Sequence, residues 1–292
     1  MGFLAGYIMQ GRTQAVSTAC VLALLSLFMP PISIVSSAVI GLITLRLGAI
    51  EGIKIFTIAL IVIGVMGLVM GITPFALLYG VVLWLPIWLI SVLLRAGRQL
   101  ALAIESGVLL GAVAILGFYL YKPDAALMWQ GIIEQMVPAT VAIESIQSRI
   151  ESIARYMTGI VVAGTVFGWV FALFLARWWQ ASLYNPGGFK TEYLSLSTKP
   201  RLALFSLILV AISALSSGYL SELCWNLSIL VFVLYSFVGT AVLHSMLLST
   251  TYGTYVIIGM YMTLFLIPHL LVPVAIIGVG DAWLNLRLGL KK

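Results

Sequence analysis

Long runs of apolar residues constrain this chain more than any other feature of its sequence. The runs at 54–72 and 101–120, for example, contain almost no charged side chain. Each is about as long as the ~20 residues that an α-helix needs to cross the hydrocarbon core of a bilayer. Hydrophobic residues make up 62% of the chain and charged residues 8%, against about 25% charged residues in a soluble domain. A soluble fold has too little interior to bury so much apolar surface, so lipid is predicted to surround most of this protein.

The secondary structure of the membrane-embedded part follows from the need to pair every backbone N–H and C=O inside the lipid. Closed barrels and helices both meet this need. A barrel requires short segments in which apolar and polar residues alternate, whereas this chain has unbroken apolar runs. The sequence therefore predicts an all-α fold.

The number of spans follows from the positions of the apolar runs. Nine candidates lie at about 13–29, 32–45, 54–72, 75–94, 101–120, 156–176, 202–220, 226–248 and 254–280. The first two meet at Pro30-Pro31, which predicts a tight hairpin, with one long kinked helix as the alternative. We expect a polytopic transmembrane helix bundle of about eight spans, or nine if every candidate crosses.

Lysine and arginine indicate the orientation, because cytoplasmic loops are enriched in these residues. With the N-terminus in the cytoplasm and nine crossings, nine basic residues lie inside and six outside. If the segment 254–280, broken by Pro268 and Pro273, fails to cross, the tail returns inside and the ratio becomes twelve to three. An even number of crossings, about eight, is therefore favoured.

The segment 121–156 has a different, amphipathic pattern. Isoleucines at 143, 146, 150 and 153 and Met157 recur at helical spacing, and polar residues occupy the other positions. Pro138 separates this helix from an earlier amphipathic turn. The segment is predicted to lie on the membrane or on the bundle, or alternatively to act as a gate over a cavity. The chain is thus expected to be a single integral membrane domain, 1–292, with N-terminal helices at 13–120 and C-terminal helices at 157–280.

A stretch rich in aromatic and turn-forming residues, RWWQASLYNPGGF, interrupts the apolar pattern at 177–189. Tryptophan and arginine favour the headgroup level of a membrane, and an Asn-Pro-Gly-Gly sequence is typical of turns. We therefore expect an interfacial loop at 177–201 on the cytoplasmic side. Two adjacent glycines also expose amide donors, so the loop is a candidate ligand or partner site. Its candidate residues are Arg177, Trp178, Trp179, Tyr184, Asn185, Pro186, Gly187, Gly188 and Phe189.

The stretch RWWQASLYNPGGFKTEY and the closing GDAWLNLR together resemble the YybS-like family of bacterial integral membrane proteins, in its proteobacterial branch. The resemblance extends from Gly11-Arg12 to the closing stretch, nearly the whole chain. It implies a multi-pass protein of the bacterial inner (cytoplasmic) membrane. This family is distantly similar to the substrate-binding S components of energy-coupling-factor vitamin transporters, although the chain has more than their six spans.

S components use an Ala-x-x-x-Ala pattern on their first helix to dock a membrane coupling subunit. Ala15, Ala19 and Ala23 have this spacing on the first candidate helix, and small residues four apart allow two helices to approach closely. These alanines are therefore helix-docking candidates. The alternative is ordinary packing inside the bundle.

Three polar residues are candidates for a role within the membrane, where a charged side chain costs about 2.5–3.5 kcal/mol on insertion scales. Glu105 lies inside the span 101–120, and His269 lies between two prolines in the last candidate span. They could form a relay for a proton or ligand, or serve as hydrogen-bonded structural groups. Asp281 is expected to form a helix-end cluster with Asn285 and Arg287.

Catalytic and nucleotide-binding motifs are absent from the sequence. It has no His-Glu-x-x-His, no Gly-x-Ser-x-Gly and no Gly-x-x-x-x-Gly-Lys. We therefore expect no enzyme activity, no catalytic residue, no cofactor and no metal. Basic residues lie beside apolar segments rather than in a groove with interleaved aromatics, so nucleic acid is not an expected partner.

The sequence as a whole favours a transport or small-molecule-binding component of the membrane that resembles a transporter S component. The expected partners are membrane lipids, a small-molecule ligand, and a membrane coupling subunit or other envelope protein. The alternative is a structural or scaffold protein of the cell envelope that acts through protein partners.

Overall fold

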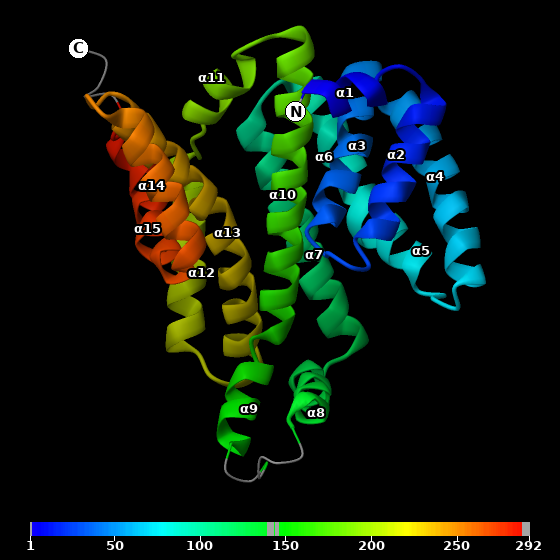
Figure 1. Ribbon diagram of the computed structural model, residues 1–292. Coiled ribbons are helices and arrows are strands. Elements are labelled where there is room, and N and C mark those ends of the chain that lie inside the picture. The colour runs from blue at the N-terminus through cyan, green and yellow to red at the C-terminus, as the bar shows by residue number, and fades with distance from the viewer. Residues whose placement is uncertain (1, 139–142, 144–145, 288–292) are drawn as a thin grey trace. The chain divides into compact units, whose positions relative to one another are not determined.

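The computed structural model describes residues 2–138, 143 and 146–287, and within these ranges it contains helices and turns but no strand (Figure 1). This confirms the predicted all-α fold. The chain divides into two compact units. Unit 1 comprises Met1–Gly107 and Phe167–Ser195, and unit 2 comprises Val108–Val166 and Leu196–Lys292.

The helices of the two units are bounded as follows. Unit 1 contains α1 (Gly2–Ile8), α2 (Arg12–Leu25), α3 (Ile32–Leu47), α4 (Ala49–Val69), α5 (Phe75–Leu77), the π-helix η1 (Leu78–Trp84), α6 (Leu85–Gly97) and α11 (Gly188–Leu194). Unit 2 contains α8 (Ala125–Met136), α9 (Gln147–Ala154), α12 (Pro200–Leu215), α13 (Gly218–Leu248), α14 (Gly253–Leu266), the 3-10 turn η3 (Pro268–Leu270) and α15 (Leu271–Leu284). The boundary between the units falls inside α7 (Leu100–Tyr121) and α10 (Met157–Tyr184).

Five helices are long and apolar enough to cross a membrane, or up to six if the bent pair α14 and α15 counts as one span. The five occupy Ala49–Val69, Phe75–Gly97, Leu100–Tyr121, Met157–Tyr184 and Gly218–Leu248. This is fewer than the eight to nine spans predicted, because α2, α3 and α12 are apolar but have only 14, 16 and 16 residues. These numbers refer to the described residues.

The outer surface of α4 indicates that the protein is embedded in a membrane. One face of α4 is buried within unit 1, including Ile55, Ala59 and Ile63. The remaining surface exposes large aliphatic side chains at Ile58, Ile61, Val65, Leu68 and Val69. A helix that is apolar on all sides needs an apolar environment around it. Protein covers one side of α4, and lipid is the medium that suits the other.

The hairpin predicted at Pro30-Pro31 is confirmed. Helix α2 ends at Leu25, α3 begins at Ile32, and the two pack against each other. The Ser36 hydroxyl on α3 donates a hydrogen bond of 2.8 Å to the carbonyl oxygen of Ala19 on α2. Because the two helices are antiparallel neighbours, the alternative of one long kinked helix is excluded.

The face of α2 that carries the three spaced alanines is occupied inside unit 1. Ala15, Ala19 and Ala23 each have no exposed surface, and α2 packs against both α3 and α4. Their burial leaves no surface on these alanines for another protein, which favours the alternative of ordinary packing inside the bundle. Their small side chains instead permit the close packing seen between the α2 and α3 backbones.

A π-helix and a proline distort the helix that follows α5. Pro86 has no backbone N–H, so it cannot donate the α-helical hydrogen bond to the carbonyl oxygen of Val82. The Trp169 indole nitrogen, on α10, donates to this oxygen at 2.7 Å. The π-helix Leu78–Trp84 lies immediately before this point, as expected where the regular ladder is interrupted.

In unit 2, α13 is the central helix and packs against α12, α14 and α15. Two glycines allow a close approach of α13 and α15. A Cβ on Gly239 would overlap the carbonyl oxygen of Val274, and a Cβ on Gly278 would overlap that of Tyr235. Only a residue without a side chain fits at these positions.

The last candidate span is not one straight helix. Helices α14 and α15 are bent by 114° at the break between them. Pro268, one of the two prolines expected to break this segment, begins η3 at that point. At its C-terminal end, the Arg287 guanidinium donates a hydrogen bond of 2.7 Å to the carbonyl oxygen of Leu196, just before α12. Figure 1 shows α14 and α15 together beside α13. The chain thus returns to the end of unit 2 at which α12 begins.

The amphipathic segment forms two helices, α8 and α9, that pack against each other. Helix α9 begins at Gln147 rather than near Ile143, so it is shorter than predicted. Ile150 is buried as expected, whereas Ile153 is 50% exposed. Glu144, one of the polar residues of this segment, lies outside the described residues.

Candidate functional site

The stretch RWWQASLYNPGGF is helical in its first part. Residues 177–184 form the last two turns of α10, so the prediction of a loop from 177 is wrong at its start. Arg, Trp, Gln, Ala and Leu are all compatible with a helix, and the helix stops only where Pro186 follows Asn185. The turn is completed by Gly187 at a φ of 85°, a conformation that favours glycine. Helix α11 follows directly.

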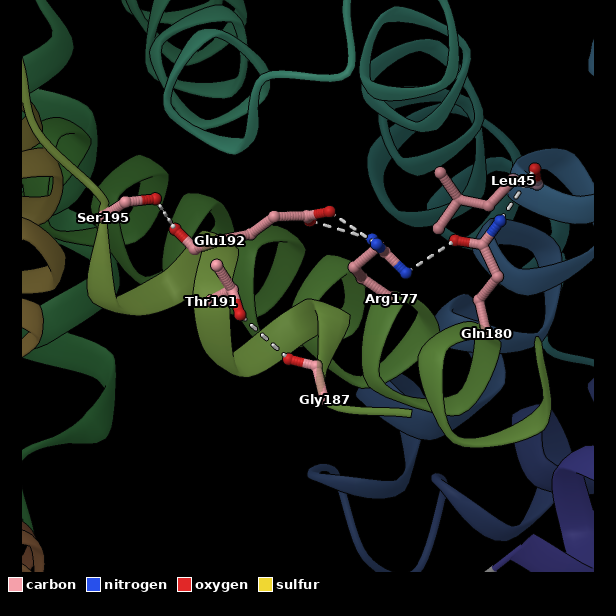
Figure 2. Close-up of polar contacts among 7 residues, drawn as sticks. All are labelled: Leu45, Arg177, Gln180, Gly187, Thr191, Glu192 and Ser195. Atoms are coloured by element: carbon pink, nitrogen blue, oxygen red, sulfur yellow. Dashed lines mark hydrogen bonds and ion pairs between the residues drawn. The ribbon is translucent and has the colours of Figure 1, made fainter. Parts of the chain in front are cut away.

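Arg177 is a buried residue at the centre of this region (Figure 2). Its guanidinium forms a bidentate ion pair with Glu192 on α11, with N–O distances of 2.9 and 2.5 Å. Bidentate pairing of this kind combines charge attraction with fixed geometry. The pair therefore folds α11 back onto the end of α10. Gly188 lies close to this ion pair, because a Cβ added to it would be 3.4 Å from the Arg177 guanidinium.

Gln180 connects α10 to the end of α3, as Figure 2 shows. Its side-chain oxygen accepts a hydrogen bond of 3.2 Å from Arg177, and its amide nitrogen donates one of 3.2 Å to the carbonyl oxygen of Leu45. The Arg95 guanidinium, at the end of α6, donates to the carbonyl oxygens of Leu45 and Arg46 at 2.6 and 2.7 Å. Because the last carbonyls of a helix have no partner within it, Arg95 caps α3.

These contacts surround a pocket of about 510 Å³ at the ends of α3, α6 and α10 in unit 1. Four arginines line it, together with one carboxylate, Glu192: they are Arg46, Arg95, Arg98 and Arg177. The side chains around this pocket thus carry a formal excess of three positive charges. We call it the arginine pocket.

Two of these arginines have an unusual contact or backbone conformation. The Arg46 guanidinium lies over the ring of Tyr184, 3.7 Å from its centroid, in cation–π geometry. Arg98 ends α6 with a φ of 50°, in the left-handed region that residues other than glycine rarely adopt. Arg98 is exposed, and it has no hydrogen-bond or ion-pair partner among the described residues. Its charge is available to a ligand.

Three of the nine residues predicted for this site, namely Arg177, Tyr184 and Asn185, line the pocket. Trp178 is 38% exposed, as suits a ring at a membrane surface. Trp179 is buried, and Phe189 packs edge-on against Phe174 at 5.5 Å. Pro186 and the two glycines form the turn and the start of α11, where the backbone N–H of Gly188 donates a hydrogen bond of 3.0 Å to the carbonyl oxygen of Asn185.

The sequence did not assign Arg46, Arg95 and Arg98 to this site, although they supply most of its charge. They lie far from 177–189 in the chain and belong to no local motif. One signal pointed toward them: the lysine and arginine bias predicts that Arg46, Arg95, Arg98 and Arg177 all lie on the cytoplasmic side.

The three intramembrane candidates have different environments. Glu105 is half-buried in α7, in unit 1. His269 is exposed within η3, at the bend between α14 and α15 in unit 2. Asp281 is buried, and Arg287 pairs with it at 2.5 Å while the backbone N–H of Leu286 donates to its other oxygen at 3.0 Å. Asp281 and Arg287 thus form the expected helix-end cluster, and Asn285 ends α15 in the left-handed conformation.

Within the described ranges, no three His, Cys, Asp or Glu side chains gather in a way that could hold a metal ion. No protein-family model, curated protein or solved structure matches the chain.

Proposed function

We propose that this protein binds a small anionic ligand in the arginine pocket, as a ligand-binding or transport component of a membrane. The observation that carries the proposal is the set of four guanidinium groups around one cavity that contains a single carboxylate. Like charges repel when they are brought together, and a bound anion relieves this repulsion. The cavity also lies in the size range, about 300–1,000 Å³, of sites for small molecules.

The ligand class follows from the chemistry of the side chains. Guanidinium groups bind carboxylates and phosphates through paired hydrogen bonds. Arg177 is already paired with Glu192, and Arg95 is anchored on α3, which leaves Arg46 and Arg98 to make the direct contacts. A ligand with at least two negative charges, such as a polycarboxylate or a phosphate compound, fits this arrangement best.

The pocket would open to the cytoplasm of a bacterial cell in the topology that we propose. The five long spans together with the shorter α2, α3 and α12 give eight crossings, and the bent pair α14 and α15 enters and leaves on one side. Twelve of the fifteen basic residues then lie on the cytoplasmic side, as expected for an inner-membrane protein.

A transport-related role for such a site is what the sequence resemblance to the YybS-like family implies, through the distant similarity of that family to transporter S components. An anion-binding pocket at the cytoplasmic end could hold a transported solute or a regulator of transport. The scaffold alternative predicts a pocket that no soluble anion occupies, and the two functions can therefore be separated by a binding measurement.

The test is the thermal stability of the purified full chain in a neutral detergent, measured with increasing citrate or pyrophosphate. Both anions are expected to raise the unfolding temperature, since a ligand that binds only the folded state stabilises it. Arg98→Gln should weaken this binding by about tenfold or more, because a hydrogen bond to a charged group contributes about 1.5–3 kcal/mol. Arg98→Lys, which keeps the charge, should retain part of the binding.

The matched control is Arg201→Gln, which removes an exposed arginine that does not line the pocket. An equal loss for Arg98→Gln and Arg201→Gln would show only nonspecific attraction and would refute the proposal. Absence of any effect of either anion would refute it as well. Repeating the titration in nanodiscs with and without phosphatidylglycerol distinguishes a soluble anion from the phosphate of a lipid headgroup, because a bound lipid phosphate competes with the added anion.

A further inference from the structure

A second cavity lies entirely within unit 2. Its volume is about 680 Å³, and it is bordered by α8, by α9 and the residues after it, and by the start of α13. Six of its lining side chains are charged or aromatic: Glu151, Arg155, Tyr156, Tyr219, Glu222 and Trp225. This amphipathic segment, predicted either to lie on a surface or to cover a cavity, therefore borders one.

Glu222 supplies a fixed negative charge to this cavity. One of its carboxylate oxygens accepts a hydrogen bond of 2.8 Å from the hydroxyl of Tyr119. Tyr119 is buried and in turn accepts a hydrogen bond of 3.0 Å from Asn226. Glu222 is half-buried, and it has no cationic partner among the described residues. A carboxylate in such a position favours a positively charged ligand.

Arg155 supplies a positive charge at the same cavity. The Asn226 side chain donates a hydrogen bond of 2.8 Å to the carbonyl oxygen of Arg155 and accepts one of 2.5 Å from the backbone N–H of Gly159. The backbone at Arg155 is thereby attached to α13. Glu151 and Arg155 have the spacing of a helical ion pair, yet no ion pair joins these two described residues. Both signs of charge therefore border the cavity without neutralising each other.

Aromatic rings line the same cavity as Glu222. Tyr219 packs edge-on against Tyr119, with ring centroids 5.7 Å apart, and Tyr156 does the same against Trp225 at 6.3 Å. Ring faces attract ammonium groups, with the strongest effect where water is excluded. A carboxylate beside several rings is thus a suitable place for a primary ammonium group.

We propose that this cavity is a second ligand site, which takes a zwitterion whose ammonium group lies at Glu222 and the rings and whose acidic group lies at Arg155. The shared chemistry is that of an aminoethyl phosphate. Its source is either a soluble phosphoethanolamine-like compound or the headgroup of phosphatidylethanolamine. The site is distinct from the arginine pocket, because it belongs to the other unit and requires a cation as well as an anion.

The soluble source is tested by isothermal titration of the full chain in maltoside detergent with phosphoethanolamine. Binding is expected, with about tenfold weaker binding of ethanolamine or inorganic phosphate alone, since each lacks one of the two charges. Glu222→Gln and Arg155→Gln should each weaken binding by about tenfold or more. Glutamine at 222 can still accept the Tyr119 hydrogen bond, so this variant is expected to fold, and its unfolding temperature checks that.

The lipid source is tested by native mass spectrometry of the chain released from nanodiscs that contain equal amounts of phosphatidylethanolamine and phosphatidylglycerol. Selective retention of phosphatidylethanolamine, lost in Glu222→Gln, would identify the headgroup as the ligand. Asp124→Asn and Arg149→Gln are the matched controls, because both residues are exposed in the same unit and neither lines the cavity. If neither source binds, or if the controls reduce binding as much as the cavity variants do, the proposal is wrong.

Discussion

The indole N–H of Trp169 on α10 donates a hydrogen bond of 2.7 Å to the carbonyl oxygen of Val82 in the π-helix η1. Pro86 is the cause of this arrangement, because it cannot supply the backbone donor that Val82 would meet in a regular helix. Inside a bilayer an unpaired carbonyl costs free energy that water cannot offset. A side chain from another helix therefore replaces the missing backbone donor.

We predict that Trp169→Phe lowers the stability of the protein, by about 1–3 kcal/mol, because it leaves the Val82 carbonyl without this donor. Pro86→Ala restores a backbone N–H near that carbonyl, so the double variant should lose less than the single Trp169→Phe variant. Thermal unfolding of the four proteins in detergent gives this double-mutant cycle. Additive losses would show that Pro86 and Trp169 do not act on the same carbonyl.

The ion pair of Arg177 and Glu192 leads to a second prediction, with two readouts of opposite sign. Glu192→Gln should destabilise the chain by about 1.5–3 kcal/mol, because the buried guanidinium loses its charged partner. The same substitution removes the one carboxylate among the described residues that line the arginine pocket, so citrate should bind more tightly. Lys190→Gln, an exposed change on the same short helix, should alter neither quantity appreciably. Weaker citrate binding in Glu192→Gln would contradict the electrostatic description of the pocket.

The contact between Arg287 and Leu196 predicts the topology of the C-terminal part. Ser197→Cys and a fluorescent protein fused after Lys292 should report the same side of the membrane, and Ser217→Cys the opposite side. The cysteines are introduced after Cys20 and Cys224 are replaced by alanine, and they are labelled with an impermeant thiol reagent in oriented vesicles. A tail on the same side as Ser217 would mean that the last segment crosses completely.

Close packing of α13 and α15 predicts a sharp difference between two glycines of the last segment. Gly278→Ala should destabilise the protein by about 1–3 kcal/mol or more, because its Cβ would overlap the backbone of α13. Gly259→Ala is the matched control on α14, since nothing lies within 4 Å of a Cβ added there. It should be neutral or slightly stabilising, as alanine favours a helix. Equal effects in thermal unfolding would show that the two helices do not approach as closely as described.

The sequence predicted those parts of the fold that depend on local patterns. Apolar runs of sufficient length predicted helices, and Pro30-Pro31 predicted the hairpin between α2 and α3. Pro268 and Pro273 predicted a defect in the last segment, which the bend of 114° confirms. Each of these features is decided by the chemistry of neighbouring residues, chiefly the missing N–H of proline.

Features that depend on which helix faces which were not predictable in the same way. The spacing of Ala15, Ala19 and Ala23 showed a surface suited to close packing, but not that α3 and α4 cover it. The arginine pocket requires the ends of three helices to meet, and its members share no spacing. The apolar helices are hydrophobic on every side. Their sequences therefore do not show which face of each helix packs against its neighbours, and the contacts between helices cannot be predicted from them.

The bent pair α14 and α15 also bears on how the protein is made. Each of these helices has 14 residues, about 21 Å of helix, which is less than the hydrocarbon core of about 30 Å. Neither helix is long enough to span the bilayer by itself as it is inserted into the membrane. The close approach of α15 to α13 at Gly239 and Gly278 therefore contributes to holding the last segment in place. The place of the last segment in unit 2 thereby depends on α13 more than on the segment's own length.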